Sequence, residues 1–358
     1  MGKSATAGAC LQALIKMAVP LLKEAERRFP RTGPGAKPTL PDWLLGVMIM
    51  VAILKRKKGK SAQFRFLADP EHRRMIANVT GNKAFPSRSM FYRRYRRAHE
   101  LSRGAIQIQG EAAIKEGVAR PEVVAFDKTM IAAQGPLWHK RDRQAERLPA
   151  GLSGVDQESG WGCSQHDGWV QGYSLEVVVT ATPGGVVFPL LASVDTASAK
   201  ETLTVADKIP ALPVATKHVL CDAGYDSNAV GEAIEYTPEG RRTGRHCLCP
   251  ENRRGSKRGP RDSPPKPRDE SHRRRLKRLK FLKGRPGRRL FARRGQTVEP
   301  FHDWFKQLFE LSHRVWHRGL DNNQTQLLAA VFAYQLLLRY NHRQGRNNGQ
   351  VKRILDRL

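Results

Sequence analysis

The sequence is short of acidic residues, and this shortage excludes an ordinary metabolic enzyme. It carries 33 Asp and Glu against 63 Lys and Arg in 358 residues, a formal net charge of +30 at pH 7. Such an excess favours a polyanionic partner, with nucleic acid as the first candidate and an anionic membrane surface as the second. The basic segments lack an apolar face of useful length, which disfavours the membrane.

Cysteines and long apolar runs are also scarce. Five cysteines, an odd number spread widely, argue against a disulfide framework and for a reducing compartment. The longest apolar run, Trp43–Leu54, is too short to span a bilayer comfortably and stops at a basic cluster, so we expect a buried helix. Since no signal peptide is visible after Lys3, we expect a cytoplasmic protein associated with the nucleoid.

Composition divides the chain into three parts. We expect a helical region over residues 1–118, an α/β domain over 119–342, and a basic C-terminal tail over 343–358. Within the second part, residues 240–294 hold 22 Lys and Arg against 4 Asp and Glu. Apolar residues are sparse there, so part of this basic segment is expected to be disordered without a partner.

The N-terminal part contains a basic helix, Ser87–Leu101, with Ser87 as its N-cap. A spacing near 3.6 residues puts Phe91 and Tyr95 on one face and leaves most of the arginines free to face outward. The arginines proposed to contact DNA are Arg93, Arg94, Arg96 and Arg97. The arrangement resembles a helix-turn-helix unit. The alternative is a solvated basic helix with an aromatic core face.

Two short apolar runs each end on a carboxylate. Val123–Phe126 leads to Asp127, and Lys217–Cys221 leads to Asp222, with a hairpin and a helix expected between them. A single Asp at a strand end more often terminates the strand or caps a helix. This order of elements is nevertheless that of an RNase H-like fold, a mixed sheet with flanking helices, in which the two strands lie side by side.

A late helix, Val298–Leu311, supplies the third acid, Glu299. Thr297 is expected to cap this helix, with Pro300 in its first turn. Glu299 and Lys306 are seven residues apart, close to two helical turns, and so share a face. An exposed pair on an amphipathic helix is the alternative. Three carboxylates at one place would suit two Mg²⁺ ions, since hard cations prefer oxygen ligands.

Other residues are weaker candidates. Lys140 and Arg141 lie in a long Gly-rich loop expected over residues 134–173, and we expect both to touch phosphate. Trp304 is the best candidate for stacking on an unpaired base, because it lies on the helix of Glu299. Core packing is the alternative for Trp304. The run His246–Cys249 has no second Cys/His pair at suitable spacing for zinc, so we expect a core strand.

In combination, these motifs resemble the DDE transposases of bacterial insertion sequences, in the group with the Tyr-Arg-Glu-Lys signature. The stretch Arg294–Phe301 with Lys306 is similar to that signature, and Phe126–Thr129 and Cys221–Asp226 are similar to the contexts of the two catalytic Asp residues. The resemblance covers about residue 40 to the end of the chain.

The resemblance implies a transposase that binds the terminal inverted repeats of its element, cleaves both ends and transfers the strands to target DNA. Asp127, Asp222 and Glu299 would be catalytic and hold two Mg²⁺ ions, with Mn²⁺ as a substitute. Arg294 and Lys306 would hold phosphates of double-stranded DNA, and a homodimer on DNA is expected. A nuclease without strand transfer and a silent DNA-binding derivative are the alternatives.

Two positions depart from the signature. Phe291 stands where the signature has Tyr, so a hydroxyl that could bond phosphate is missing. Arg294 lies five residues before Glu299, one more than the usual spacing, which places the role of the Arg in question but not that of Glu299 or Lys306.

Overall fold

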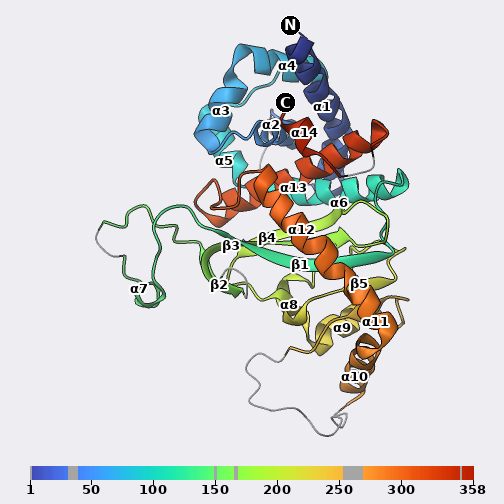
Figure 1. Cartoon of the computed structure of the whole chain (residues 1–358). Coiled ribbons are helices and arrows are strands. Elements are labelled where there is room, and N and C mark those ends of the chain that lie inside the picture. Colours follow the sequence, from blue (N-terminus) through green and yellow to red (C-terminus); the bar gives the residue numbers. More distant parts are fainter. Residues whose placement is uncertain (1, 31–38, 149–150, 165–167, 253–268, 347–348) are drawn as a thin grey trace.

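The computed structural model describes residues 2–30, 39–148, 151–164, 168–252, 269–346 and 349–358, which form a mixed sheet with helices packed around it (Figure 1). The strands are β1 (Val123–Ala132), β2 (Gly160–Ser164), β3 (Gly168–Thr180), β4 (Pro189–Thr196), β5 (His218–Leu220) and β6 (His246–Leu248). The N-terminal helices are α1 (Gly2–Arg28), α2 (Asp42–Leu54), α3 (Lys60–Ala68), α4 (Pro70–Thr80), α5 (Arg88–Tyr95) and α6 (Ala98–Lys115). The later helices are α7 (Lys140–Gln144), α8 (Glu201–Thr204), the 3-10 turn η1 (Ala223–Tyr225), α9 (Asn228–Glu235), α10 (Glu270–Lys283), α11 (Arg285–Phe291), α12 (Arg293–Leu308), α13 (Leu320–Arg343) and α14 (Lys352–Leu355).

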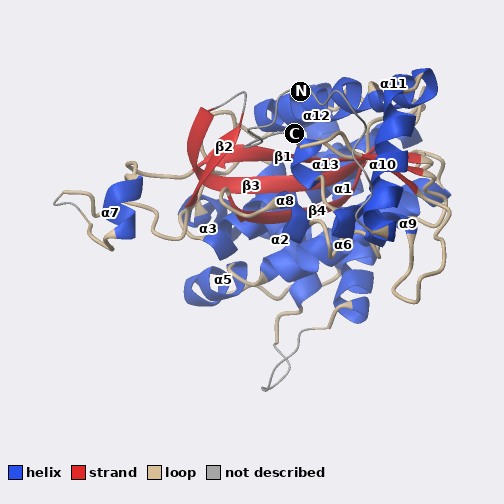
Figure 2. Ribbon diagram, turned by 90° about the horizontal axis from the view of Figure 1, so that it is seen from below, coloured by secondary structure: helices blue, strands red, loops and turns tan. Residues whose placement is uncertain are grey.

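The strand order confirms the expected RNase H-like sheet. β1 pairs with β3 in the antiparallel sense and with β5 in the parallel sense, and β6 follows β5 in parallel. β4 pairs antiparallel with β3, and β2 pairs with the first part of β3. Helix α12 crosses over β1 (Figure 1), and Figure 2 shows it along one side of the strands.

The expectation that β1 ends on Asp127 is wrong. Its parallel pairing with β5 stops at Ala125, opposite Leu220, but its antiparallel pairing with β3 continues to Ala132, opposite Gly172. Asp127 therefore lies in the middle of a long strand, just past the point where β5 stops. A continuing antiparallel neighbour supplies the hydrogen bonds that keep the strand extended.

Strand β2 lies within the stretch expected to be a loop. Two of its five residues, Gly160 and Gly162, are glycines that neighbouring chain approaches closely. A Cβ on Gly162 would lie 2.4 Å from the carbonyl oxygen of Ala197. Glycines selected for close approach weaken the sequence signal of a strand.

The N-terminal helices share one core with the sheet. Gln335 of α13 donates hydrogen bonds to the carbonyls of Ile106 in α6 (3.0 Å) and Pro189 in β4 (2.7 Å). The end of the chain also packs inward, since Ile354 and Leu355 of α14 are buried. The basic tail expected over residues 343–358 therefore contains a packed helix. Among the described residues, no helix is long and apolar enough to cross a membrane.

Part of the basic segment is held by acids of α9 and of the turn that precedes it. Arg274 contacts Glu232 at 2.6 Å, and Arg275 forms two hydrogen bonds with Asp226. These pairs hold α10 against α9 despite its many positive charges. Residues 253–268, where disorder was also expected, lie outside the described residues.

Candidate active site

Asp127 and Asp222 meet where β1 and β5 lie side by side. Continuing the parallel register past Ala125 and Leu220 by two residues sets Asp127 beside Asp222. Both carboxylates face one guanidinium: Nη2 of Arg294 donates to Oδ1 of Asp127 at 2.5 Å and lies 3.7 Å from Oδ2 of Asp222. The sequence expectation that these two acids meet is confirmed by the register of the strands.

A tight turn after β5 orients Asp222. Its Oδ1 accepts a hydrogen bond from the backbone N of Gly224 at 2.7 Å, and its main-chain carbonyl accepts one from Sγ of Cys249 at 2.9 Å. A Cβ on Gly224 would lie 1.8 Å from Oε2 of Glu201 and 3.0 Å from Oδ1 of Asp222. Glycine at this position thus lets Glu201 and Asp222 approach the turn. Ser227 caps α9, with Oγ accepting a hydrogen bond from the backbone N of Val230 at 3.0 Å.

Helix α12 begins earlier than its sequence suggests. The expected cap Thr297 lies inside the helix and donates through Oγ1 to the carbonyl of Arg293 at 2.9 Å, and Pro300 lies in the interior. The earlier start places Arg294 in the first turn and His302 two turns later, so both lie near one face. His302 is buried, and its Nε2 lies 3.4 Å from Oδ2 of Asp127.

The surroundings keep Asp127 charged. Burial raises the pKa of Asp127, but the contact with His302 and the charge of Arg294 outweigh it, so the pKa falls below its ordinary value. For Arg294, burial lowers the pKa while the charges of Asp127 and Asp222 raise it, with a net increase. Nε of Arg294 is buried and has no hydrogen-bond partner among the described residues.

Glu299 lies on the same helix but apart from the two Asp residues. Its side chain is exposed and folds back along α12, with Oε1 3.7 Å from the place of a Cβ on Gly295. In the part of the chain that the structure describes, no three His, Cys, Asp or Glu side chains are gathered for a metal ion. The role of Glu299 as third acid therefore stays a prediction. Lys306, two turns later, is half-buried.

The opposite face of β1 carries charges that sequence reasoning did not single out. Lys128 lies 3.3 Å from Glu201, and cross-strand Glu176, only 2% exposed, binds Lys208 at 2.5 Å. Tyr225 of the turn after Asp222 donates to Glu176 at 2.7 Å. Glu176 thereby anchors the turn that holds Asp222. The sequence signal that could have identified Glu176 is its position as a single acid in the apolar run Leu175–Val179.

The sequence matches the family described as Transposase DDE domain over residues 119–336, more than half of the chain. The chain belongs to this family. A solved structure of piggyBac transposase, a synaptic complex with hairpin DNA, is similar at 11% identity and a TM-score of 0.39, over 97% of this chain and 78% of that one. No curated protein is similar enough to count as a match.

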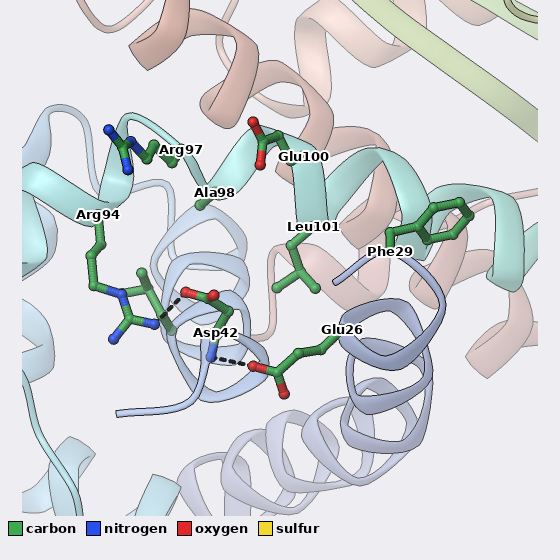
Figure 3. Close-up of a pocket in the computed structure, with 9 residues that line it drawn as sticks. Glu26, Phe29, Asp42, Arg94, Arg97, Ala98, Glu100 and Leu101 are labelled. Carbon is green, nitrogen blue, oxygen red and sulfur yellow. Dashed lines mark hydrogen bonds and ion pairs between the residues drawn. The ribbon is translucent and has the colours of Figure 1, made fainter. Parts of the chain in front are cut away.

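Away from Asp127 and Asp222, the prediction that Arg94 faces outward is wrong. Arg94 is 8% exposed, and its guanidinium binds the carbonyl of Leu40 and the carboxylate of Asp42, whose backbone N donates to Glu26 (Figure 3). These contacts tie α5 to the start of α2 and hold the guanidinium of Arg94 inside the fold rather than on the surface. Burial on the aromatic side of a short helix overrides the preference of arginine for solvent.

The other predicted DNA contacts of this transposase-family chain remain on its surface. The side chains of Arg93, Arg96, Arg97 and Arg141 are exposed. Lys140 begins α7, and its side chain lies outside the described structure.

The tryptophans are packed to different degrees. Trp304 is half-buried and lines a hollow of about 430 Å³ with Phe301 and Tyr334. Trp138 and Trp161 are tied into the fold, because Nε1 of Trp161 donates to the carbonyl of Trp138 at 2.9 Å.

Proposed function

We propose that this protein is a transposase that cleaves the ends of a DNA element and joins the freed 3′-hydroxyls to target DNA. The observation that carries the proposal is that Asp127 and Asp222 lie just past the paired parts of two adjacent parallel strands and face the same guanidinium, in a chain that belongs to the DDE family. The excess of 63 Lys and Arg over 33 Asp and Glu supports a nucleic-acid substrate.

The residues at this centre fit divalent cations. Asp127 and Asp222 offer carboxylate oxygens, which Mg²⁺ prefers, and the guanidinium of Arg294 between them indicates a position that favours positive charge. We propose that Asp127, Asp222 and Glu299 hold two Mg²⁺ or Mn²⁺ ions. When bound, such ions supply acidity to an attacking water or 3′-hydroxyl and neutralise the leaving oxygen.

The chain's own side chains would position the DNA. Arg294 and Lys306 would bind phosphates on either side of the scissile bond, and His302 would orient Asp127 through its 3.4 Å contact. Trp304 would stack on an unpaired base. Because two element ends must be processed together, we propose a homodimer on DNA.

Cleavage and joining can be tested with the purified full chain. The substrate is a duplex carrying the inverted repeats that flank its gene, supplied uncut or pre-cut together with a target plasmid and Mg²⁺. We expect nicked products from the first and joined products from the second. Nicking without joining would support a nuclease instead, and tight, salt-sensitive binding without either product would support a silent derivative.

The variant Asp222→Ala provides the decisive control. We expect it to bind the duplex like the wild type but to give no Mg²⁺-dependent product, because a metal-binding carboxylate is lost. Retained cleavage in this variant would contradict the assignment of the site.

A further inference from the structure

Three arginines of α11 and α12 line a hollow beside the acidic centre. Arg285, Arg289 and Arg293 border a space of about 400 Å³, with Pro286 and Leu290 as its apolar part. The arginines are four residues apart, so they lie on successive turns of one face. Ala292, between the two helices, has helical backbone angles and keeps this face continuous.

Among the described residues, these three arginines have no acidic partner, in contrast to three arginines of α10. Arg274, Arg275 and Arg278 of α10 all form ion pairs with α9 or with the turn after β5. Within the described residues, the guanidinium groups of Arg285, Arg289 and Arg293 form no ion pair. Guanidinium groups stay charged at all physiological pH values, so neighbours four residues apart repel each other on the helix. An anion in the hollow would remove this repulsion.

The position of the hollow suggests which anion it takes. Arg293 is followed directly by Arg294, whose guanidinium contacts Asp127. Eight residues of helix rise by about 12 Å, so the row from Arg285 to Arg293 is an extended track rather than a point site. Figure 1 shows α11 continuing the line of α12 away from β1. An extended polyanion lying in the hollow would thus lead to the two Asp residues.

We infer that the hollow formed by Arg285, Arg289 and Arg293 binds consecutive backbone phosphates of the DNA strand that enters the acidic centre. This inference rests on the proposed function and names a phosphate contact surface for it. Guanidinium forks suit phosphate oxygens, whereas Pro286 and Leu290 offer no side-chain donor or acceptor for base edges. The site would therefore bind DNA independently of sequence.

The inference can be tested by DNA binding alone, without metal or cleavage. The probe is a fluorescent duplex of arbitrary sequence, and its dissociation constant is measured by anisotropy over a series of chloride concentrations. We expect Arg289→Ala to weaken binding to every sequence alike and to reduce the slope of log K against log salt by about 1. The matched control is Arg288→Ala, which removes an exposed arginine of the same helix that does not line the hollow.

The outcomes separate this inference from the proposed function. Equal salt slopes for the two variants would overturn the phosphate track, even if the wild type cleaves DNA. A smaller slope for Arg289→Ala alone would support it, even if no cleavage were found. Inorganic phosphate is the second probe, and the melting temperature is measured with and without it. If phosphate raises the melting temperature of the wild type but not of Arg289→Ala, while both proteins bind DNA equally, the hollow binds free phosphate. The inference is then wrong.

Discussion

The two faces of β1 differ in how completely their charges are paired. On the face of Lys128, the buried Glu176 accepts hydrogen bonds from Lys208 and Tyr225, and its side-chain oxygens are satisfied. On the face of Asp127, buried nitrogens of Arg294 and His302 have no hydrogen-bond partner among the described residues. Buried polar atoms without partners cost free energy and are enriched where a ligand or reaction supplies the missing contact.

This difference indicates that successive residues of β1, Asp127 and Lys128, have different roles. Alternating side chains point to opposite faces, so Asp127 and Lys128 can belong to separate networks although they are neighbours in the chain. The closed network around Glu176 stabilises the turn after β5. The open network leaves the carboxylates of Asp127 and Asp222 beside the guanidinium of Arg294. We therefore expect substitutions on the open face to affect chemistry and those on the closed face to affect stability.

The largest effect is expected for Asp222→Asn on the open face. The amide still accepts the hydrogen bond from Gly224 but loses the charge that holds a cation, so nicking of a supercoiled plasmid with Mg²⁺ should fall to the level without protein. The free energy of unfolding should change by less than about 0.5 kcal/mol, since the side chain is 37% exposed. Asp303→Asn, an exposed acid of α12, serves as the control and should retain nicking. A stability loss without loss of nicking would break the comparison.

Substitutions on the face of Lys128, where Glu176 is paired, should lower the free energy of unfolding. Lys208→Met leaves the buried Glu176 without its cation, and removing one partner of a buried ion pair costs about 3–5 kcal/mol. Urea unfolding of the purified chain measures this loss, with the exposed Lys217→Met as the matched control. The double variant Glu176→Gln/Lys208→Met should recover part of the stability. If Lys208→Met unfolds like the control variant, the closed network does not support the fold.

A smaller effect is expected for Arg294→Ala. Without the guanidinium, the charges of Asp127 and Asp222 are no longer neutralised by the protein, so Mn²⁺ should bind about tenfold more tightly in the absence of DNA, equivalent to about 1.4 kcal/mol. Isothermal titration calorimetry measures the affinity, and Arg293→Ala, which removes an adjacent arginine without an acidic partner, is the control. Weaker Mn²⁺ binding in Arg294→Ala would show that the arginine does not compete with a cation.

The smallest effect concerns pH. Because the pKa of folded Asp127 lies below its ordinary value of 3.8, its charged form adds stability above that value, and this stability is lost as the pH falls through the folded pKa. As the pH falls from about 5 to about 2, the wild type should therefore lose more stability than Asp127→Asn. Thermal unfolding across this range measures the difference. Parallel curves for the two proteins would place the stabilising contacts of Asp127 in doubt.

Sequence reasoning was most accurate for features that depend on residues close together in the chain. The apolar runs before Asp127 and Asp222 predicted two strands side by side, and Ser87 was recognised as a cap because a capping hydroxyl acts within one turn. The prediction of helix boundaries failed where contacts with distant segments determine them. Thr297 and Pro300 resemble a helix start, yet packing of α12 across β1 extends the helix back to Arg293.

The basic residues show the same limit. Composition predicted a polyanionic partner from the excess of Lys and Arg, and any arrangement of these residues would carry that charge. Which arginines are paired depends on what lies opposite them. Arg94 meets Asp42, Arg275 meets Asp226, and Arg289 meets no acid among the described residues. Identical side chains thus acquire different environments.

The sequence by itself determined the main order of the elements, the two acids after apolar runs and the net positive charge of the chain, because these depend on residue type and spacing along the chain. Only the tertiary structure decided that Arg294 and His302 meet Asp127, that Glu176 supports the turn of Asp222, and that three arginines share one hollow. Each of these contacts joins residues from separate helices, strands or turns, and their side-chain directions are set by the packing of those elements rather than by local sequence.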